Sequence, residues 1–146
     1  MPKSQKVNKQ LVTQSSINPA SRTGNPIRDR RVQVVKILIE DNFHRRLDLS
    51  EMAKAVKLSS WRLAHLFKDE VGISPLRYLT LLRLQKARQS LETGFLTVRE
   101  IAASVGIPNA SHFTRSFKAA YGSSPVAHRS AYSRIVATKD TIRPAK

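Results

Sequence analysis

Two stretches of this chain match each other: DLSEMAKAVKLSSWRLAHLFKDEVGISP at residues 48–75 and TVREIAASVGIPNASHFTRSFKAAYGSSP at residues 97–125. Each begins with a cap residue followed three places later by glutamate, the pattern of a capping box at a helix start. A short helical stretch, a tight turn, a second helical stretch, a glycine and Ser-Pro then follow in both. This order is typical of a helix-turn-helix unit, whose second helix can enter a DNA major groove. We therefore predict two such units, over about residues 48–71 and 97–121.

The turns of the two copies differ in one informative way. The copies are offset by 49 residues before the turn and by 50 after it, so one residue is gained near residues 108–112. Gly106 suits the left-handed backbone that a tight turn often needs, whereas Lys57 in the same place would be strained by about 1 kcal/mol. We expect the second helix to be capped by Ser59 or Ser60 in the first copy and by Asn109 in the second.

The sequence around the copies also has helical periodicity. Apolar residues at helical spacing predict a first helix over about residues 28–42. Ser74 and Pro75 predict the start of a long helix over about residues 75–92, and Gly94 its end. Its expected inner stripe is Leu76, Leu79, Leu84, Ala87 and Leu91. Because no run alternates apolar and polar residues, we predict an all-α protein.

The charge of the chain indicates a polyanionic partner. There are 26 Lys and Arg against 10 Asp and Glu, a formal net charge of +16, which nucleic acid most often explains. A ribosome-like or membrane-surface role would fit the same balance. We expect a flexible basic arm over residues 1–28 and a flexible tail over residues 133–146, because both are poor in apolar side chains.

No feature of the sequence indicates catalysis or a bound metal. The four histidines lack metal-ligand spacing, and glycine-rich phosphate loops and nucleophile motifs are missing. We therefore expect no enzyme activity and no cofactor. The absence of cysteine, of a signal peptide and of a long apolar run favours a soluble cytoplasmic protein.

The outward faces of the two second helices carry side chains suited to DNA. Stepping about 100° per residue places apolar residues on one side and polar, cationic and flat ones on the other. The outward set is Trp61, His65 and Lys68, flanked by Arg62 and Ala64, and then Ser111, His112, Arg115 and Lys118. Five of them have a plainer alternative: Arg115, His65, Lys68 and Lys118 as passive surface residues, and Trp61 folded over a neighbouring helix.

The combined motifs resemble the DNA-binding domain of the AraC/XylS family. They are Leu63-x-x-Leu66-Phe67-Lys68, Gly72-Ile73-Ser74-Pro75, Arg83-Leu84-x-x-Ala87, Ile101-Ala102-x-x-Val105-Gly106-Ile107, Phe113-x-x-x-Phe117-Lys118 and Ser124-Pro125. The resemblance covers about residues 29–132. It implies a domain of about seven helices, with two homeodomain-like helix-turn-helix subdomains joined by the long helix at 75–92.

The resemblance also implies which residues meet DNA. The base contacts would be Trp61, Ala64, His65, Ser111, His112 and Arg115. The backbone contacts would be Ser60, Arg62, Lys68, Arg99, Asn109 and Lys118. One monomer would then read two successive major-groove segments about one helical turn apart. The first helix has His65 and Ala64 where the family often has arginine or another polar residue, so we expect the second helix to dominate base readout.

The layout resembles the small single-domain activators of the family, the MarA/SoxS type. It implies a monomer that binds double-stranded DNA at the nucleoid, with RNA polymerase as a further partner, no membrane and no small-molecule effector. Two rival interpretations remain open from the sequence. One is an architectural protein that coats DNA without sequence preference; the other is a DNA-binding fragment that needs a partner. The repeats could also be plain helical hairpins in a small bundle.

Overall fold

The computed structural model describes residues 29–142, and all the regular structure in that range is helical. The helices are α2 (Arg30–Asn42), α3 (Leu49–Ala55), α4 (Ser60–Val71), α5 (Pro75–Thr93), α6 (Val98–Ser104), α7 (Ala110–Tyr121) and α8 (Pro125–Ile142). These seven helices confirm the predicted all-α class. The predicted basic arm at 1–28 and the last residues of the predicted tail, 143–146, lie outside the described range.

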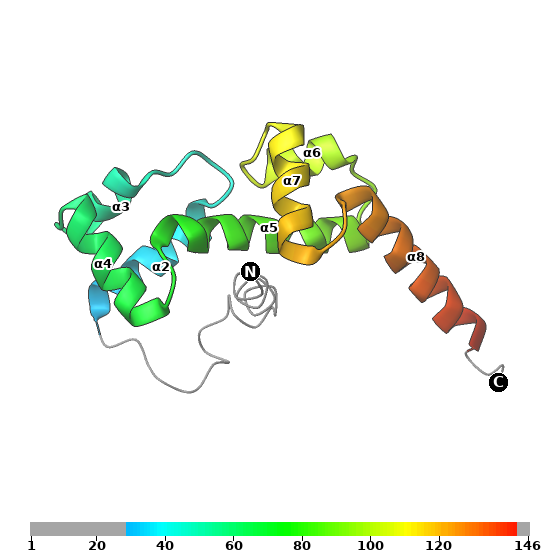
Figure 1. Ribbon diagram of the computed structural model, residues 1–146, viewed down its shortest axis with the longest axis horizontal. Helices are drawn as coiled ribbons and strands as arrows, with labels where there is room; N and C mark the ends of the chain where they lie inside the picture. The colour runs from blue at the N-terminus through cyan, green and yellow to red at the C-terminus, as the bar shows by residue number, and fades with distance from the viewer. Residues whose placement is uncertain (1–28, 143–146) are drawn as a thin grey trace, which may run out of the picture. The chain divides into compact units, whose positions relative to one another are not determined.

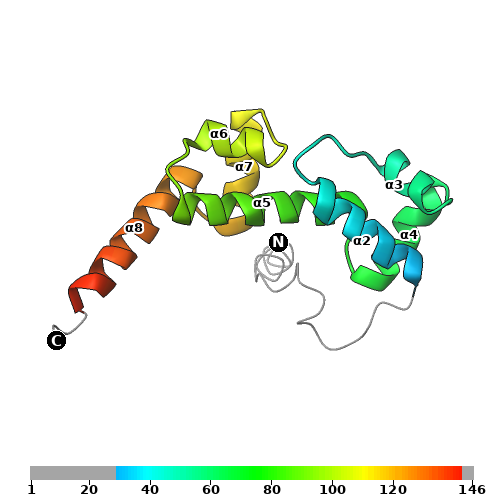
Figure 2. The same cartoon turned by 180° about the vertical axis from the view of Figure 1, so that it is seen from behind.

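The chain forms two compact units that divide between Arg83 and Leu84, within α5. In the first unit, α2 packs against both α3 and α4 (Figure 1 and Figure 2). The buried core of this unit joins all three helices to the start of α5. It consists of Val32, Val35, Ile39, Leu47, Met52, Ala53, Leu63, Phe67, Tyr78, Leu79, Leu81 and Leu82.

The second unit repeats this plan with the end of α5, α6, α7 and α8. Helix α7 packs against both α6 and α8. The buried side chains include Leu84, Ala87, Leu91, Ile101, Ala102, Val105, Ile107, Phe113, Phe117 and Ala120. Each unit therefore has its own hydrophobic core, and in each a helix-turn-helix pair, α3 with α4 or α6 with α7, packs on that core.

An arginine closes the end of the first helix in each unit. Arg83 donates from Nε to the carbonyl of Phe43 and from Nη2 to that of Arg45, both at 2.7 Å. Arg129 does the same for the carbonyls of Leu91 and Leu96. The carbonyls of Phe43 and Leu91 lie at the ends of α2 and α5, where acceptors lack a partner within the helix. Those of Arg45 and Leu96 lie in the loops that follow, so each guanidinium joins a helix end to its loop.

Polar side chains also link the first and last helices of each unit. In the first, the Tyr78 hydroxyl donates to Glu40 at 2.9 Å, and the Lys36 ammonium lies 5.6 Å from the Tyr78 ring centre. Burial lowers the pKa of Lys36, while the charge of Glu40 acts in the opposite direction. In the second unit, His128 and Arg88 both contact Oε1 of Glu92, at 2.9 and 3.1 Å.

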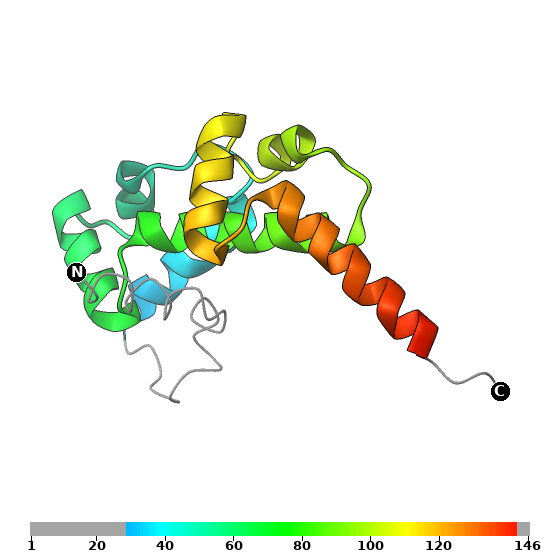
Figure 3. The ribbon, with the colours of Figure 1, turned by 45° about the vertical axis from the view of Figure 1, so that its right-hand side comes forward.

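One expectation about the long helix is wrong, and the helix after it is longer than the sequence indicated. Leu76 was placed on the inner stripe of α5 but is 45% exposed, because it lies in the first turn, where the neighbouring helices do not cover it. Residues 133–142 of the predicted tail continue α8 away from α7 (Figure 3), and the flexibility of this stretch stays a prediction. This stretch has no glycine or proline. The hydroxyls of Thr138 and Thr141 donate hydrogen bonds to the backbone carbonyls four residues earlier in the helix. The helix therefore continues through residues 133–142 although the side chains of residues 133–141 are exposed.

None of the helices between residues 29 and 142 combines the length and apolar character needed to cross a bilayer.

Candidate nucleic-acid interface

The two turns have the same hydrogen bonds at the same offset. Leu58 N–H donates to the carbonyl of Ala53 at 2.9 Å, and Ile107 N–H donates to that of Ala102 at 2.9 Å. In each turn, the residue just before this N–H donor has a left-handed backbone, with φ of 59° at Lys57 and 88° at Gly106. Lys57 thus adopts the left-handed conformation, for which the expected cost to a residue with a side chain is about 1 kcal/mol.

Side-chain caps and glycines set the ends of the recognition helices α4 and α7. Ser59 accepts from the N–H of Arg62 at the start of α4, and Asn109 accepts from that of His112 at the start of α7. Ser59 rather than Ser60 is thus the first cap. The helices end at Gly72 and Gly122, whose φ angles of 94° and 82° fit the left-handed residue that commonly ends a helix.

The first helices of the two helix-turn-helix pairs, α3 and α6, start differently, although both were predicted to have capping boxes. Thr97 and Glu100 form the complete box, each side chain bonding the other's backbone N–H. These bonds from the backbone and the hydroxyl of Thr97 lower the pKa of Glu100. Asp48 accepts from the N–H of Glu51, but the Glu51 carboxylate turns to Arg45 instead. The box is half-formed there because a cation competes for the carboxylate.

Helix α4 presents its predicted outer face to solvent. Leu63 and Phe67 are fully buried beneath it, whereas Trp61 is 68% exposed. Also exposed are Arg62, His65 and Lys68, while Ser60 and Ala64 are partly buried. Trp61 does not fold over a neighbouring helix. Its indole lies against the imidazole of His65, with ring centres 4.0 Å apart.

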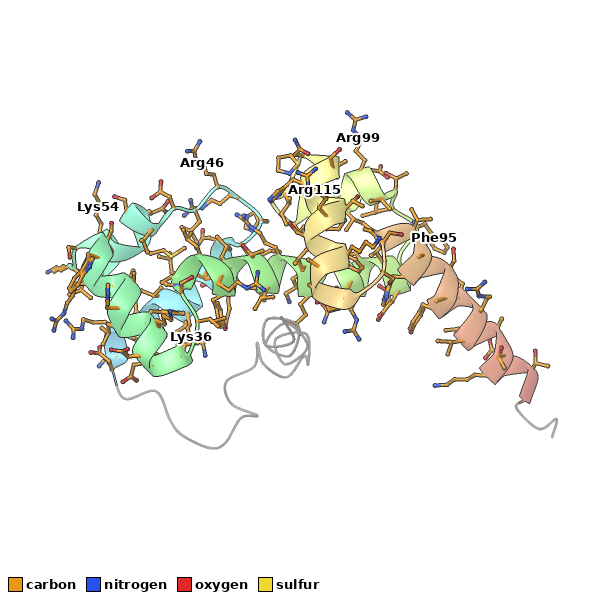
Figure 4. All side chains as sticks on the ribbon, viewed as in Figure 1. Lys36, Arg46, Lys54, Phe95, Arg99 and Arg115 are labelled. Carbon is orange, nitrogen blue, oxygen red and sulfur yellow. The ribbon has the colours of Figure 1, made fainter. Side chains whose placement is uncertain are left out.

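Helix α7 presents the corresponding face in the second unit. Phe113 and Phe117 are fully buried, whereas Ser111, His112, Arg115 and Lys118 are exposed, as are Asn109 and, on α6, Arg99. Figure 4 shows Arg99 on α6 and Arg115 on α7 extending from their helices. The predicted contacts of the second unit thus all lie on its surface. Their role in binding DNA stays a prediction.

One predicted backbone contact lies close to an acidic residue. Asp29 caps α2 and binds Arg31 through both carboxylate oxygens, at 3.0 Å to Nε and 2.7 Å to Nη2. These bonds, aided by the charges of Arg31 and Arg62, lower the pKa of Asp29 to about 2. The Asp29 carboxylate is therefore charged at neutral pH and interacts electrostatically with Arg62, one of the predicted backbone contacts.

A hydrogen bond between His65 and Trp61, on the outer face of α4, was not predicted from the sequence. His65 Nδ1 lies 2.9 Å from the carbonyl of Trp61, one turn back along α4. The spacing of four residues was visible in the sequence, and residues four apart are neighbours on a helix. Among residues 29–142, no group of three or more His, Cys, Asp or Glu side chains could hold a metal ion.

Comparisons with known proteins give this geometry a family. A family model for a helix-turn-helix domain matches residues 52–131. The uncharacterized HTH-type transcriptional regulator YfiF of Bacillus subtilis is 36% identical over 98 residues, which are 67% of this chain and 31% of YfiF. The arabinose operon regulatory protein of Escherichia coli is 32% identical over 101 residues, 69% of this chain and 33% of that protein.

Solved structures agree. The C-terminal domain of AraT, a response regulator from Geobacillus stearothermophilus, matches with a TM-score of 0.68 at 32% identity, covering 70% of this chain and 86% of that one. The DNA-binding domain of AdpA, solved with a target DNA, matches with a TM-score of 0.67 at 29% identity, covering 73% and 95%.

The chain belongs to the helix-turn-helix family of DNA-binding proteins. Within it, the domain is of the AraC type found in transcriptional regulators. The chain spans between 26% and 40% of the length of the curated relatives it matches. These relatives are larger regulators, so the likeness to the single-domain MarA/SoxS type stays a prediction.

Proposed function

We propose that this chain is a sequence-specific transcription regulator that reads two successive major-groove segments with α4 and α7. The observation that carries this proposal is the agreement of the two recognition helices. Both have a side-chain N-cap, a buried apolar face and a glycine end, and their exposed residues correspond at an offset of 50. Two helices with matching exposed faces are suited to binding two successive segments of the DNA major groove.

The roles of the exposed residues follow from their chemistry. The Arg115 guanidinium can donate two hydrogen bonds to O6 and N7 of one guanine, the commonest specific contact in the major groove. Its exposure on α7 leaves it accessible for that contact. Trp61 offers a flat apolar surface for a thymine methyl group or a sugar. We assign Lys68 and Lys118, in the last turns of their helices, to contacts with phosphates.

The regulatory setting is proposed on the same basis. The chain acts on double-stranded DNA as a monomer and recruits or blocks RNA polymerase there, without a small-molecule effector of its own. A net charge of +16 supports fast, electrostatically steered association with DNA at the nucleoid. Activation is the activity for which some relatives are named, among them the transcriptional activator NphR of Rhodococcus, which is 35% identical over 102 residues.

The test is selection of binding sites from random DNA of about 25 base pairs at near-physiological salt. Wild type and Arg115→Ala are run side by side. We expect wild type to enrich one asymmetric motif in two blocks about one helical turn apart, roughly 34 Å. Arg115→Ala should lose the guanine of one block, at a cost of about 1–3 kcal/mol.

The rival is an architectural protein that coats DNA, and the high net charge favours it as the second candidate. Its affinity would fall steeply with salt and depend little on sequence. If no motif is enriched while DNA is still retained at low salt, the regulator proposal is wrong and this rival replaces it.

A further inference from the structure

The ring of His65 is held so that only one of its nitrogens is available to DNA. Nδ1 lies 2.9 Å from the carbonyl oxygen of Trp61. A carbonyl oxygen can only accept a hydrogen bond, so Nδ1 carries the proton. A neutral imidazole has one N–H, and the tautomer is set by the bond that the other nitrogen makes. Nε2 is therefore left with a lone pair and acts only as an acceptor.

Nε2 has no competing partner in the part of the chain that the structure describes. The one hydrogen bond of His65 within residues 29–142 is that of Nδ1. The indole of Trp61 covers a face of the imidazole, with ring centres 4.0 Å apart and planes inclined by 34°. The side chain is exposed to solvent on the outer face of α4. A DNA base can therefore form a hydrogen bond with this ring only at Nε2.

We infer that His65 reads a base amino group, so that the base it contacts is adenine or cytosine and not guanine or thymine. In the major groove, adenine N6 and cytosine N4 are hydrogen-bond donors. Guanine N7 and O6 and thymine O4 are acceptors, which a neutral Nε2 cannot bond. The stacked indole holds the ring in this orientation before DNA arrives, which lowers the entropy cost of binding. This inference rests on the proposed function and adds a base preference to its first recognition helix.

The equivalent position of the second unit has the opposite polarity. His65 corresponds to Arg115 at the offset of 50, and a guanidinium has donors only. The two recognition helices are therefore complementary to different bases at matched places. A single substitution should convert one preference into the other, because His65→Arg replaces an acceptor with a fork of donors.

The experiment is site selection at about pH 8, where an ordinary histidine is neutral. Wild type, His65→Ala and His65→Arg are compared, with Arg115→Ala as the matched control in the other unit. Wild type should enrich adenine or cytosine at one position of the first block. That preference should disappear in His65→Ala and become guanine in His65→Arg. Arg115→Ala should change only the other block. Thermal unfolding of each variant checks that the fold is intact.

A second arm removes the amino group from the DNA. The selected base is replaced by a purine without the C6 amino group or a pyrimidine without the C4 amino group. Wild type should lose roughly 2- to 12-fold in affinity, the range for one neutral hydrogen bond, and His65→Ala should lose nothing. Guanine or thymine at the His65-dependent position, or an unchanged first block in His65→Ala, would overturn the inference while leaving the proposed function standing. If wild type enriches no motif, the proposed function fails and takes this inference with it.

Discussion

At the turn inside each helix-turn-helix unit, one residue has a left-handed backbone, and the two units fill that place differently. Lys57 has a φ of 59°, and Gly106 has a φ of 88°. A side chain costs about 1–2 kcal/mol in this region, whereas glycine adopts it freely. We expect Gly106→Ala to lower the free energy of unfolding by about 1 kcal/mol. Lys57→Gly should leave it unchanged or raise it by up to about 1 kcal/mol. Urea denaturation measures both, and a destabilised Lys57→Gly would show that its side chain has a compensating contact.

Single residues were predictable where one backbone requirement or one face of a helix decided them. The repeat placed a left-handed residue at both turns, because the same chain reversal must occur in each copy. Trp61 was assigned correctly to the outer face of α4. Its stack on His65 was not predicted, because helical spacing makes the two residues neighbours but side-chain torsions decide whether their rings meet. The wrong assignment of Leu76 arose because periodicity gives a direction but not the length of the neighbouring helices.

Among the helices, Arg83 is the side chain that ties the end of α2 to α5. Its guanidinium donates to the carbonyls of Phe43 and Arg45, and burial lowers its pKa. Arg83→Met keeps much of the volume but removes both charge-assisted bonds. We expect the free energy of unfolding to fall by about 1.5–3 kcal/mol. Chemical denaturation of the variant beside wild type measures the change, and a loss under about 0.5 kcal/mol would mean that water replaces the guanidinium without cost.

The start of α6 should make stability depend on acid pH. Hydrogen bonds from Thr97 lower the pKa of Glu100 below its usual 4.5. A carboxyl with a lowered folded-state pKa stabilises the fold above its unfolded value, and this contribution is lost as the pH falls through the folded value. Tm should therefore fall more steeply below about pH 4.5 in wild type than in Glu100→Gln. Asp69→Asn, at an exposed carboxylate on α4, serves as the control. Equal slopes in wild type and Glu100→Gln would contradict the prediction.

Helix positions were predictable wherever a local signal marks an end. Ser74-Pro75 and Gly94 bracket α5, and Asn109 and Gly122 bracket α7, each within a residue or two of the predicted bounds. The end of α8 was not predictable in this way. Its second half buries little, so it lacks the apolar stripe by which helices are recognised. The partner of Glu51 was missed because Arg45 lies in a loop whose path has no periodicity.

For the whole molecule, the excess of positive charge makes DNA affinity strongly dependent on salt. The slope of log K against log salt counts the phosphates contacted, at about 0.9 for each. If Lys68 and Lys118 each contact a phosphate, Lys68→Ala and Lys118→Ala should each reduce the slope by about 1, and the double variant by about 2. Lys139→Ala, on the exposed end of α8, should leave it unchanged. Titrations at several salt concentrations decide this, and an unchanged slope in the double variant would remove both lysines from the interface.

The organisation into two units was predictable because the duplication is in the sequence itself. Each copy has its own caps and its own buried residues, so each forms a core with nearby segments of the chain. The base that each recognition helix prefers could not be read at this level. It depends on which nitrogen of a ring is bonded and which edge of a side chain is free, and these are properties of the folded helix.

The stacked Trp61 gives the molecule an optical label of its own. It is the only tryptophan in the chain, and it lies on the exposed face of the first recognition helix. The fluorescent side chains of the second unit are tyrosine and phenylalanine. Its ultraviolet emission therefore reports on one half of the proposed interface without any attached dye. When DNA covers α4, the indole passes from water into a groove, and its spectrum and accessibility to a dissolved quencher should change. Docking of the first unit could thus be followed in real time and separately from that of the second.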